Sequence, residues 1–314
     1  MTRLPAVALL CLVSATAAAE QPGFTNVGSF ATALALPAVG RGEVVPDGAS
    51  GWDWSADLVN EYLHEGSGAN EILMDGETER IAGRWRHGVA EGWEVSVELP
   101  FLIRNGGFMD HTIESWHQAI GLPNGGRDQA PSNDYHYRYV RDGRVVVDTD
   151  DSYRGLGDAQ LAAGWQLAPG TALRAMAKLP SGSKNHLSGG TSGGAVWLDW
   201  NTEPGRWSAY LSGGVSTSTK GPLGDQQRRV VPFAGAGLDL ALGERWDLFG
   251  QVYAHQSVGK GDAAFAPLTH NALPMALGVS WRAAAHTTLD LAFQEDLEVN
   301  ASPDFSLRIG LRFL

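Results

Sequence analysis

The chain is almost free of cysteine. Its one cysteine, Cys11, lies in an N-terminal segment that we expect to be removed, so the mature protein has neither a disulfide nor a thiolate nucleophile. Long apolar runs are also absent, and no stretch reaches the roughly 20 residues that a transmembrane helix needs. Basic residues are outnumbered, 23 against 35 acidic ones, and the net charge of −12 argues against nucleic acid as a partner. No residue pattern indicates a cofactor.

The first 19 residues have the layout of a secretory signal peptide. Arg3 supplies the positive start, residues 6–13 form a short apolar core, and Ala17-Ala18-Ala19 offers a cleavage site before Glu20. The sequence therefore predicts an exported protein with a cleaved signal peptide at 1–19.

Glycine and tryptophan are abundant, with 40 and 11 residues, and short alternating runs recur, which is the profile of an all-β chain. The last run, 305–314, alternates apolar residues with Ser, Arg or Gly up to the end. In a soluble sandwich its apolar face would be core, whereas in an outer-membrane barrel that face meets lipid. This run resembles the final strand that the barrel-assembly machinery of Gram-negative bacteria recognises, with Leu314 displacing the terminal aromatic by one position.

Residues 20–50 show no sustained period and are predicted to be an extended arm at the periplasmic end that can enter the lumen; a short strand at 31–36 is the alternative. From residue 51 onward about twelve strands follow, joined by connections that alternate between short and long, as in outer-membrane barrels. We expect a polar loop at 64–75, and an even strand number places both termini on the periplasmic side. The predicted strands lie near 52–62, 76–88, 92–102, 156–167, 171–181, 193–202, 207–217, 230–241, 246–257, 272–283, 287–297 and 304–314.

Nine tryptophans fall at strand ends next to short turns or at the entry to the first strand. Because indole prefers the headgroup region of a membrane, this placement predicts an aromatic girdle and favours a barrel over a soluble β-sandwich. The girdle residues are Trp52, Trp54, Trp85, Trp93, Trp165, Trp200, Trp207, Trp246 and Trp281.

The other face of the strands carries charges of both signs. The favoured interpretation is a ladder of ion pairs that keeps buried charges matched, and the alternative is a narrow polar pore that selects solutes by residual charge. Strand parity assigns to the lumen Asp53, Asp57, Glu61, Arg80, Arg84, Arg86, Glu94, Glu98, Asp158, Arg174, Lys178, Asp199, Asp239, Asp247, Arg282, Asp290, Asp296, Arg308 and Arg312.

The pattern breaks at 103–155, which is too long for an idle loop. Residues 110–121 predict a short helix that Asp110 caps, with Ile113, Trp116 and Ile120 as an apolar stripe. A hairpin is expected around Asp142-Gly143. This insertion would act as a gate in the mouth or as a receptor surface above it.

Several motifs resemble a known family. They are the stretch from Gly107 through Trp116 and His117, then Gly121-Leu122-Pro123, Gly126-Arg127-Asp128, Gly155-Leu156-Gly157-Asp158 and Leu179-Pro180-Ser181-Gly182. Together they resemble a family of Gram-negative outer-membrane barrels known only as a domain of unknown function. The last two are also similar to the outer-membrane proteins named for a phenol meta-degradation pathway, which implies a channel for hydrophobic substrates.

Evidence for chemistry is weaker. His111, Glu114 and His117 are spaced i, i+3 and i+6, which suits a metal site or simply hydrogen bonding within a packed loop. A lipid-modifying enzyme of the phospholipase or lipid A deacylase type would need an activated serine or water, for which Ser115 beside His111, or His255 near a rim, are the candidates. No nucleophile motif supports either residue, so a catalytic role is not favoured.

The sequence thus predicts a monomeric outer-membrane β-barrel of about twelve antiparallel strands with a partly helical extracellular insertion. We expect a narrow channel or binding barrel for a small solute, gated by 103–155 and surrounded by outer-membrane lipid and lipopolysaccharide. The alternatives are the lipid-modifying enzyme and a plugged barrel with a structural or adhesive role.

Overall fold

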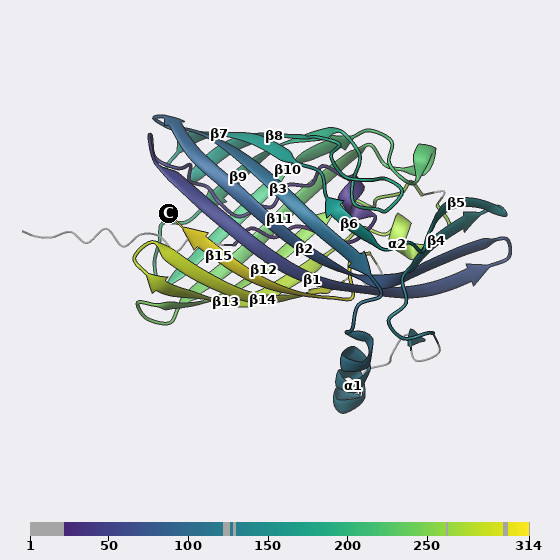
Figure 1. The fold of residues 1–314 in the computed structure, drawn as a ribbon. Coiled ribbons are helices and arrows are strands. Elements are labelled where there is room, and N and C mark those ends of the chain that lie inside the picture. Colours follow the sequence, from purple (N-terminus) through teal and green to yellow (C-terminus); the bar gives the residue numbers. More distant parts are fainter. Residues whose placement is uncertain (1–21, 122–125, 128–129, 262, 298–300, 314) are drawn as a thin grey trace, which may run out of the picture.

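The computed structural model describes residues 22–121, 126–127, 130–261, 263–297 and 301–313, and it forms one closed β-barrel (Figure 1). Each wall strand pairs with two antiparallel neighbours, and β1 pairs with both β2 and β15, which closes the ring. In chain order the twelve wall strands are β1 (Ser50–Ser67), β2 (Asn70–Ala90), β3 (Trp93–Asn105), β7 (Gln160–Ala168), β8 (Thr171–Lys178), β9 (Gly193–Asn201), β10 (Trp207–Ser218), β11 (Val230–Ala241), β12 (Trp246–His255), β13 (Pro274–Ala284), β14 (Thr287–Asp296) and β15 (Phe305–Phe313). The predicted twelve-strand antiparallel barrel is confirmed.

Connections at the two ends of the barrel differ in length. One end, the short-turn end, has links such as 91–92, 169–170 and 285–286. The other, the long-loop end, carries the extended connections and the elements outside the ring. These elements are α1 (Asp110–Ile120), β4 (His136–Arg141), β5 (Arg144–Thr149), η3 (Gly224–Gln226) and α2 (Ala266–Thr269). The short strand β6 (Tyr153–Leu156) pairs with β3 and continues the wall beyond β7. Among the described residues, no helix is long and apolar enough to cross a membrane.

The outer surface of the wall is apolar, as a lipid-facing surface must be. Ile81, Leu211 and Ile309 are each about half exposed although they are large aliphatic residues. Seven of the nine girdle tryptophans are 42–62% exposed, whereas Trp85 and Trp281 are less accessible. Paired rings stack on neighbouring strands, with centroids 5.4 Å apart for Trp93 and Trp165 and 5.8 Å apart for Trp246 and Trp281.

The long-loop end differs from expectation in two places. Residues 64–75 are not a polar loop, because β1 and β2 continue as one hairpin to the Ser67–Asn70 pair. The hairpin persists since β2 gains a further partner: Glu71 to Asp75 pair with β4, and Ile72 is completely buried there. Asp110 does not cap α1, since its carboxylate accepts hydrogen bonds from Arg127 Nη1 (2.8 Å) and from the Asn133 backbone N–H (2.7 Å).

The alternative strand at 31–36 is also absent. Instead η1 (Ala31–Ala33) is a single 3₁₀ turn, followed by extended backbone that pairs with no wall strand. Residues 22–45, which we call the arm, run through the barrel interior, where Phe30, Leu34 and Val39 are almost completely buried. The predicted signal segment, residues 1–19, and Leu314 lie outside the described residues.

Candidate functional site in the lumen

The arm is held in the lumen by side chains from all around the wall. On one side, Ser218 Oγ accepts a hydrogen bond from Ala35 N (2.9 Å), and Tyr253 donates its hydroxyl hydrogen to Pro37 O (3.3 Å). Nearer the short-turn end, Glu94 Oε2 accepts from the backbone N–H of Val45 at 2.8 Å. Side-chain partners thus replace the backbone pairing that a strand would make.

An apolar and aromatic cluster closes the long-loop end. Tyr137 and Tyr139 of β4 are completely buried and lie in one core cluster with Leu34 of the arm and Leu187 and Leu268 from two other loops. Tyr137 also donates its hydroxyl hydrogen to Glu61 Oε2 at 3.0 Å. The hairpin of the insertion therefore packs onto the arm and covers it.

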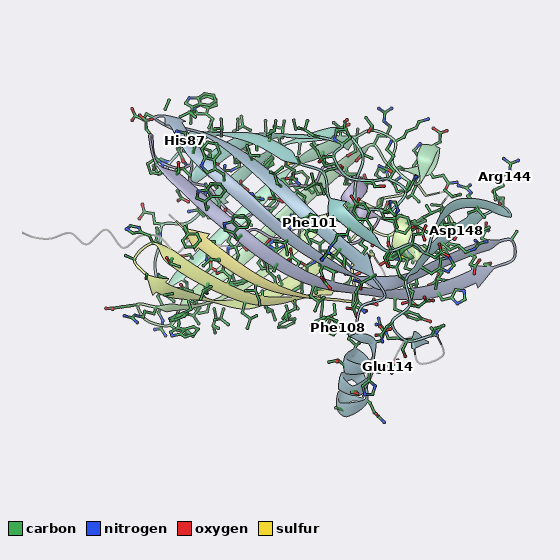
Figure 2. All side chains as sticks on the ribbon, viewed as in Figure 1. His87, Phe101, Phe108, Glu114, Arg144 and Asp148 are labelled. Atoms are coloured by element: carbon green, nitrogen blue, oxygen red, sulfur yellow. The ribbon has the colours of Figure 1, made fainter. Side chains whose placement is uncertain are left out.

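Helix α1 takes no part in this closure. It projects sideways from the barrel, and the labelled residues Phe108 and Glu114 lie outside the mouth (Figure 2). Phe108 is 63% exposed. Among the described residues of the insertion, those that pack over the arm are Tyr135 and residues of the hairpin, and the gate expected at 103–155 stays a prediction.

Most of the charges that parity assigns to the lumen are joined in ion pairs. Glu94 binds both Arg86 (2.8 Å) and Arg174, and Glu98 binds both Arg80 and Arg84. The further pairs are Asp57 with Arg80 and with Arg308, Lys178 with Asp158, Arg174 with Asp199, Arg282 with Asp247, and Arg312 with Asp290.

The remaining predicted lumen charges bind other groups. Glu61 accepts from the backbone N–H of Ser29 in the arm (3.0 Å), and Asp53 binds Arg41 of the arm at 3.3 Å. Asp296 accepts from the backbone N–H groups of Ala301 and Ser302 at 2.8 Å each. Asp239 is buried.

The candidate catalytic and metal-binding residues do not come together. Within the described residues, no group of three or more metal-ligating side chains is present. His111 and Glu114 lie on the projecting helix, and the side chain of His117 is outside the described residues. His255 faces the lumen rather than lipid: its Nδ1 donates to Gln256 O (2.8 Å), and its Nε2 accepts from Asn26 of the arm (2.9 Å).

The family-like motifs anchor loops. Arg127 binds Asp110, Asn60 Oδ1 (2.6 Å) and Asp304 Oδ2 (3.2 Å), and so ties the insertion to β1 and to the loop before β15. Desolvation by the surrounding protein raises the pKa of Asp304 to about 6, although 38% of its side chain remains accessible. Gly121 and Gly126 adopt positive φ angles of 77° and 89°, which favour glycine, and Pro123 and Asp128 lie outside the described residues.

The family-like motifs at 155–158 and 179–182 meet in one buried node around Asp158. Its carboxylate binds the Lys178 ammonium and accepts from the backbone N–H groups of Gly182 (2.8 Å), Gly190 (2.7 Å) and Thr191 (3.2 Å). Gly155 of β6 pairs with Leu102 of β3, and Gly157 N donates to Pro100 O at 2.9 Å. Pro180 lies in the exposed link after β8. The node fixes the loop between β8 and β9 on the rim.

Two arginines, one buried and one partly buried, were missed from the sequence. Arg104 is fully buried and donates from Nη1 to Ser29 Oγ in the arm at 2.6 Å. It has the parity of Glu94 and Glu98, so a third strand extended to residue 105 would have found it. Arg41 lies in the arm, where no period exists to assign its direction.

A family model described as "Protein of unknown function (DUF3187)" matches residues 3–314. The chain belongs to the DUF3187 family. This membership confirms the predicted resemblance to a family of unknown function. No curated protein matches the DUF3187 chain in sequence.

Solved outer-membrane barrels resemble this DUF3187 protein in fold. The COG4313 outer membrane channel from Pseudomonas putida F1 is 13% identical, with a TM-score of 0.55 over 88% of this chain and 99% of the other. The NanC porin is 12% identical, with a TM-score of 0.47 over 84% and 99% of the two chains. The Pseudomonas putida toluene transporter TodX is 9% identical, with a TM-score of 0.39 over 92% and 97%. The first similarity shows a common fold, and the other two are too loose to carry an argument.

Proposed function

We propose that this DUF3187 protein is an outer-membrane channel for a small solute and that the arm closes its lumen in the conformation described here. One observation carries this proposal: the arm fills the barrel without joining the sheet. Two isolated backbone bridges involve residues 22–49: one joins Phe24 to Val39, both in the arm, and the other joins Asp47 to Gly88 at the short-turn end. Because the wall keeps all its backbone pairs without the arm, the arm can leave while the barrel stays closed.

Polar space beside the arm supports passage of a solute. Two small cavities, of about 60 Å³ and about 50 Å³, lie between the arm and the wall, and both are lined by Arg84 and Glu98. The hairpin of the insertion would act as a second barrier, since Tyr137 and Tyr139 cover the arm at the long-loop end. In this proposal the short-turn end is periplasmic.

The filled lumen also favours a second candidate, a permanently plugged barrel with a structural or adhesive role. The two functions differ in one measurable property, because only the channel requires the arm to move. A covalent lock between arm and wall separates them.

Val39 of the arm and Gly235 of β11 offer the place for that lock. A Cβ atom at position 235 would lie 3.5 Å from Val39 Cβ, within the range of about 3.5–4.5 Å that a disulfide requires. It would also approach Val39 Cγ2 at 2.5 Å, an atom that Val39→Cys removes. The predicted mature chain has no cysteine of its own, so the pair Val39→Cys and Gly235→Cys forms a single defined crosslink.

The experiment is single-channel conductance of the double variant in planar bilayers, first oxidised and then reduced in the same chamber. We expect few or no openings when the disulfide is formed and wild-type openings after reduction, while Val39→Cys alone is indifferent to the reductant. Equal conductance before and after reduction contradicts closure by the arm. No conductance from the wild type, and none from the double variant whether oxidised or reduced, favours the plugged barrel.

A further inference from the structure

Arginines dominate the lining of the larger lumen cavity. Five arginines but only three carboxylates reach it, although the chain as a whole carries a net charge of −12. The arginines are Arg41 from the arm, Arg80 and Arg84 from β2, and Arg308 and Arg312 from β15. Local charge at this cavity is therefore opposite in sign to that of the protein.

In most of these ion pairs the arginine side chain is also more accessible than the carboxylate that it binds. Side-chain exposure is 24% for Arg84 and 14% for Arg80, against 8% for their shared partner Glu98. The same order holds for Arg308 over Asp57, 9% against 3%, and for Arg312 over Asp290, 5% against 1%. Only the Arg41–Asp53 pair reverses it, with 12% against 19%. A solute in the cavity thus meets N–H donors before it meets carboxylate oxygens.

We infer that this cavity is a binding site for small organic anions that carry a carboxylate, which would be the solutes of the channel. The inference rests on the proposed channel function for access to the cavity. A guanidinium group is permanently charged and offers two parallel N–H donors that match a carboxylate. Arg84 is the best placed, because its side chain is the most exposed of the five, although its Nε and Nη2 also bind Glu98.

Binding is measured on the full mature protein in detergent by calorimetry, with benzoate as the anionic probe and benzamide as its neutral match. We expect benzoate to bind and benzamide not to bind. Arg84→Gln should weaken benzoate binding about tenfold, because one charge-assisted hydrogen-bond partner is lost. Arg84→Lys keeps the charge but loses the guanidinium donors, so its affinity for benzoate should lie between those of the wild type and Arg84→Gln.

Arg144→Gln is the matched control, because Arg144 is exposed in the hairpin outside the barrel (Figure 2). This variant should bind benzoate as tightly as the wild type does. Heat-modifiable migration on gels checks that each variant folds. If Arg84→Gln fails to fold, Arg41→Gln tests the same cavity from the arm, outside the wall.

Conductance in a KCl gradient separates this inference from the channel function. Benzoate binding without any conductance supports the anion site and overturns the channel. A reversal potential that favours chloride over potassium, and that moves toward potassium in Arg84→Gln, supports both. Conducting protein that binds benzoate no better than benzamide overturns the anion site alone.

Discussion

Asp57 on β1 binds Arg308 on β15 across the seam where the barrel closes. The same carboxylate also accepts from Arg80 Nη1 of β2 at 3.1 Å, so one buried acid joins the first, second and last wall strands. Only 3% of the Asp57 side chain is exposed. The seam between chain ends is therefore fixed by charge as well as by backbone pairing.

Replacing Asp57 by Asn should destabilise the barrel strongly. The change leaves the buried Arg308 and the partly buried Arg80 without their shared partner, and removing one member of a buried ion pair typically costs about 3–5 kcal/mol. Equilibrium unfolding by urea in detergent micelles measures the loss. As control, Asp142→Asn removes a carboxylate that is 77% exposed and should change the free energy of unfolding by less than about 0.5 kcal/mol. Equal stability of the two variants would show that the seam does not depend on this charge.

Asp304 should make stability depend on pH in a defined direction. Its pKa is raised from 3.8 to about 6 by desolvation, so the folded protein holds this proton more tightly than the unfolded chain does. Its contribution to stability is therefore complete below about pH 4 and is lost as the pH rises through 6. The unfolding free energy of the wild type minus that of Asp304→Asn should decrease between these values and level off above about pH 7. A difference that rises with pH would contradict the assignment.

Asp158→Asn should loosen the loop between β8 and β9. The amide keeps the size of the side chain, but Lys178, which is 3% exposed, loses its carboxylate partner. We expect trypsin to cleave after Lys184 in that loop much faster than in the wild type, with a loss of about 3 kcal/mol in stability. Asp151→Asn, at an exposed position, is the control. An unchanged cleavage rate would mean that the three backbone donors to Asp158 suffice to hold the loop.

The two halves of the insertion should affect conductance differently. Tyr137→Ala removes a fully buried ring that packs over the arm and should raise the frequency of openings. Phe108→Ala changes an exposed side chain beside α1 and should leave openings as they are. Single-channel recordings of both variants test this difference. A larger effect of Phe108→Ala would place the gate in the helical half.

Alternation carried most of the information that the sequence offered. Side chains on a strand point alternately to its two faces, so the period of two separated Trp52 and Trp54 from Asp53 and Asp57 without any knowledge of the fold. Strands that follow one another in the chain pair in an antiparallel barrel, and closure pairs the last strand with the first. The acidic first strand and the basic second and last strands therefore indicated ion pairs between them. Strand number followed in the same way from the alternation of short and long connections.

The sequence by itself determined the barrel class, the twelve wall strands and the direction of side chains along them, because each depends on a local period. Tertiary structure alone decided how the lumen is filled. The arm has no period, and its position depends on contacts between distant residues, such as Lys178 Nζ with Thr32 O at 2.9 Å and Arg104 with Ser29. The same holds for the long β1–β2 hairpin and the sideways helix α1, which are set by pairing with β4 and by the Arg127–Asp110 link rather than by their own sequences.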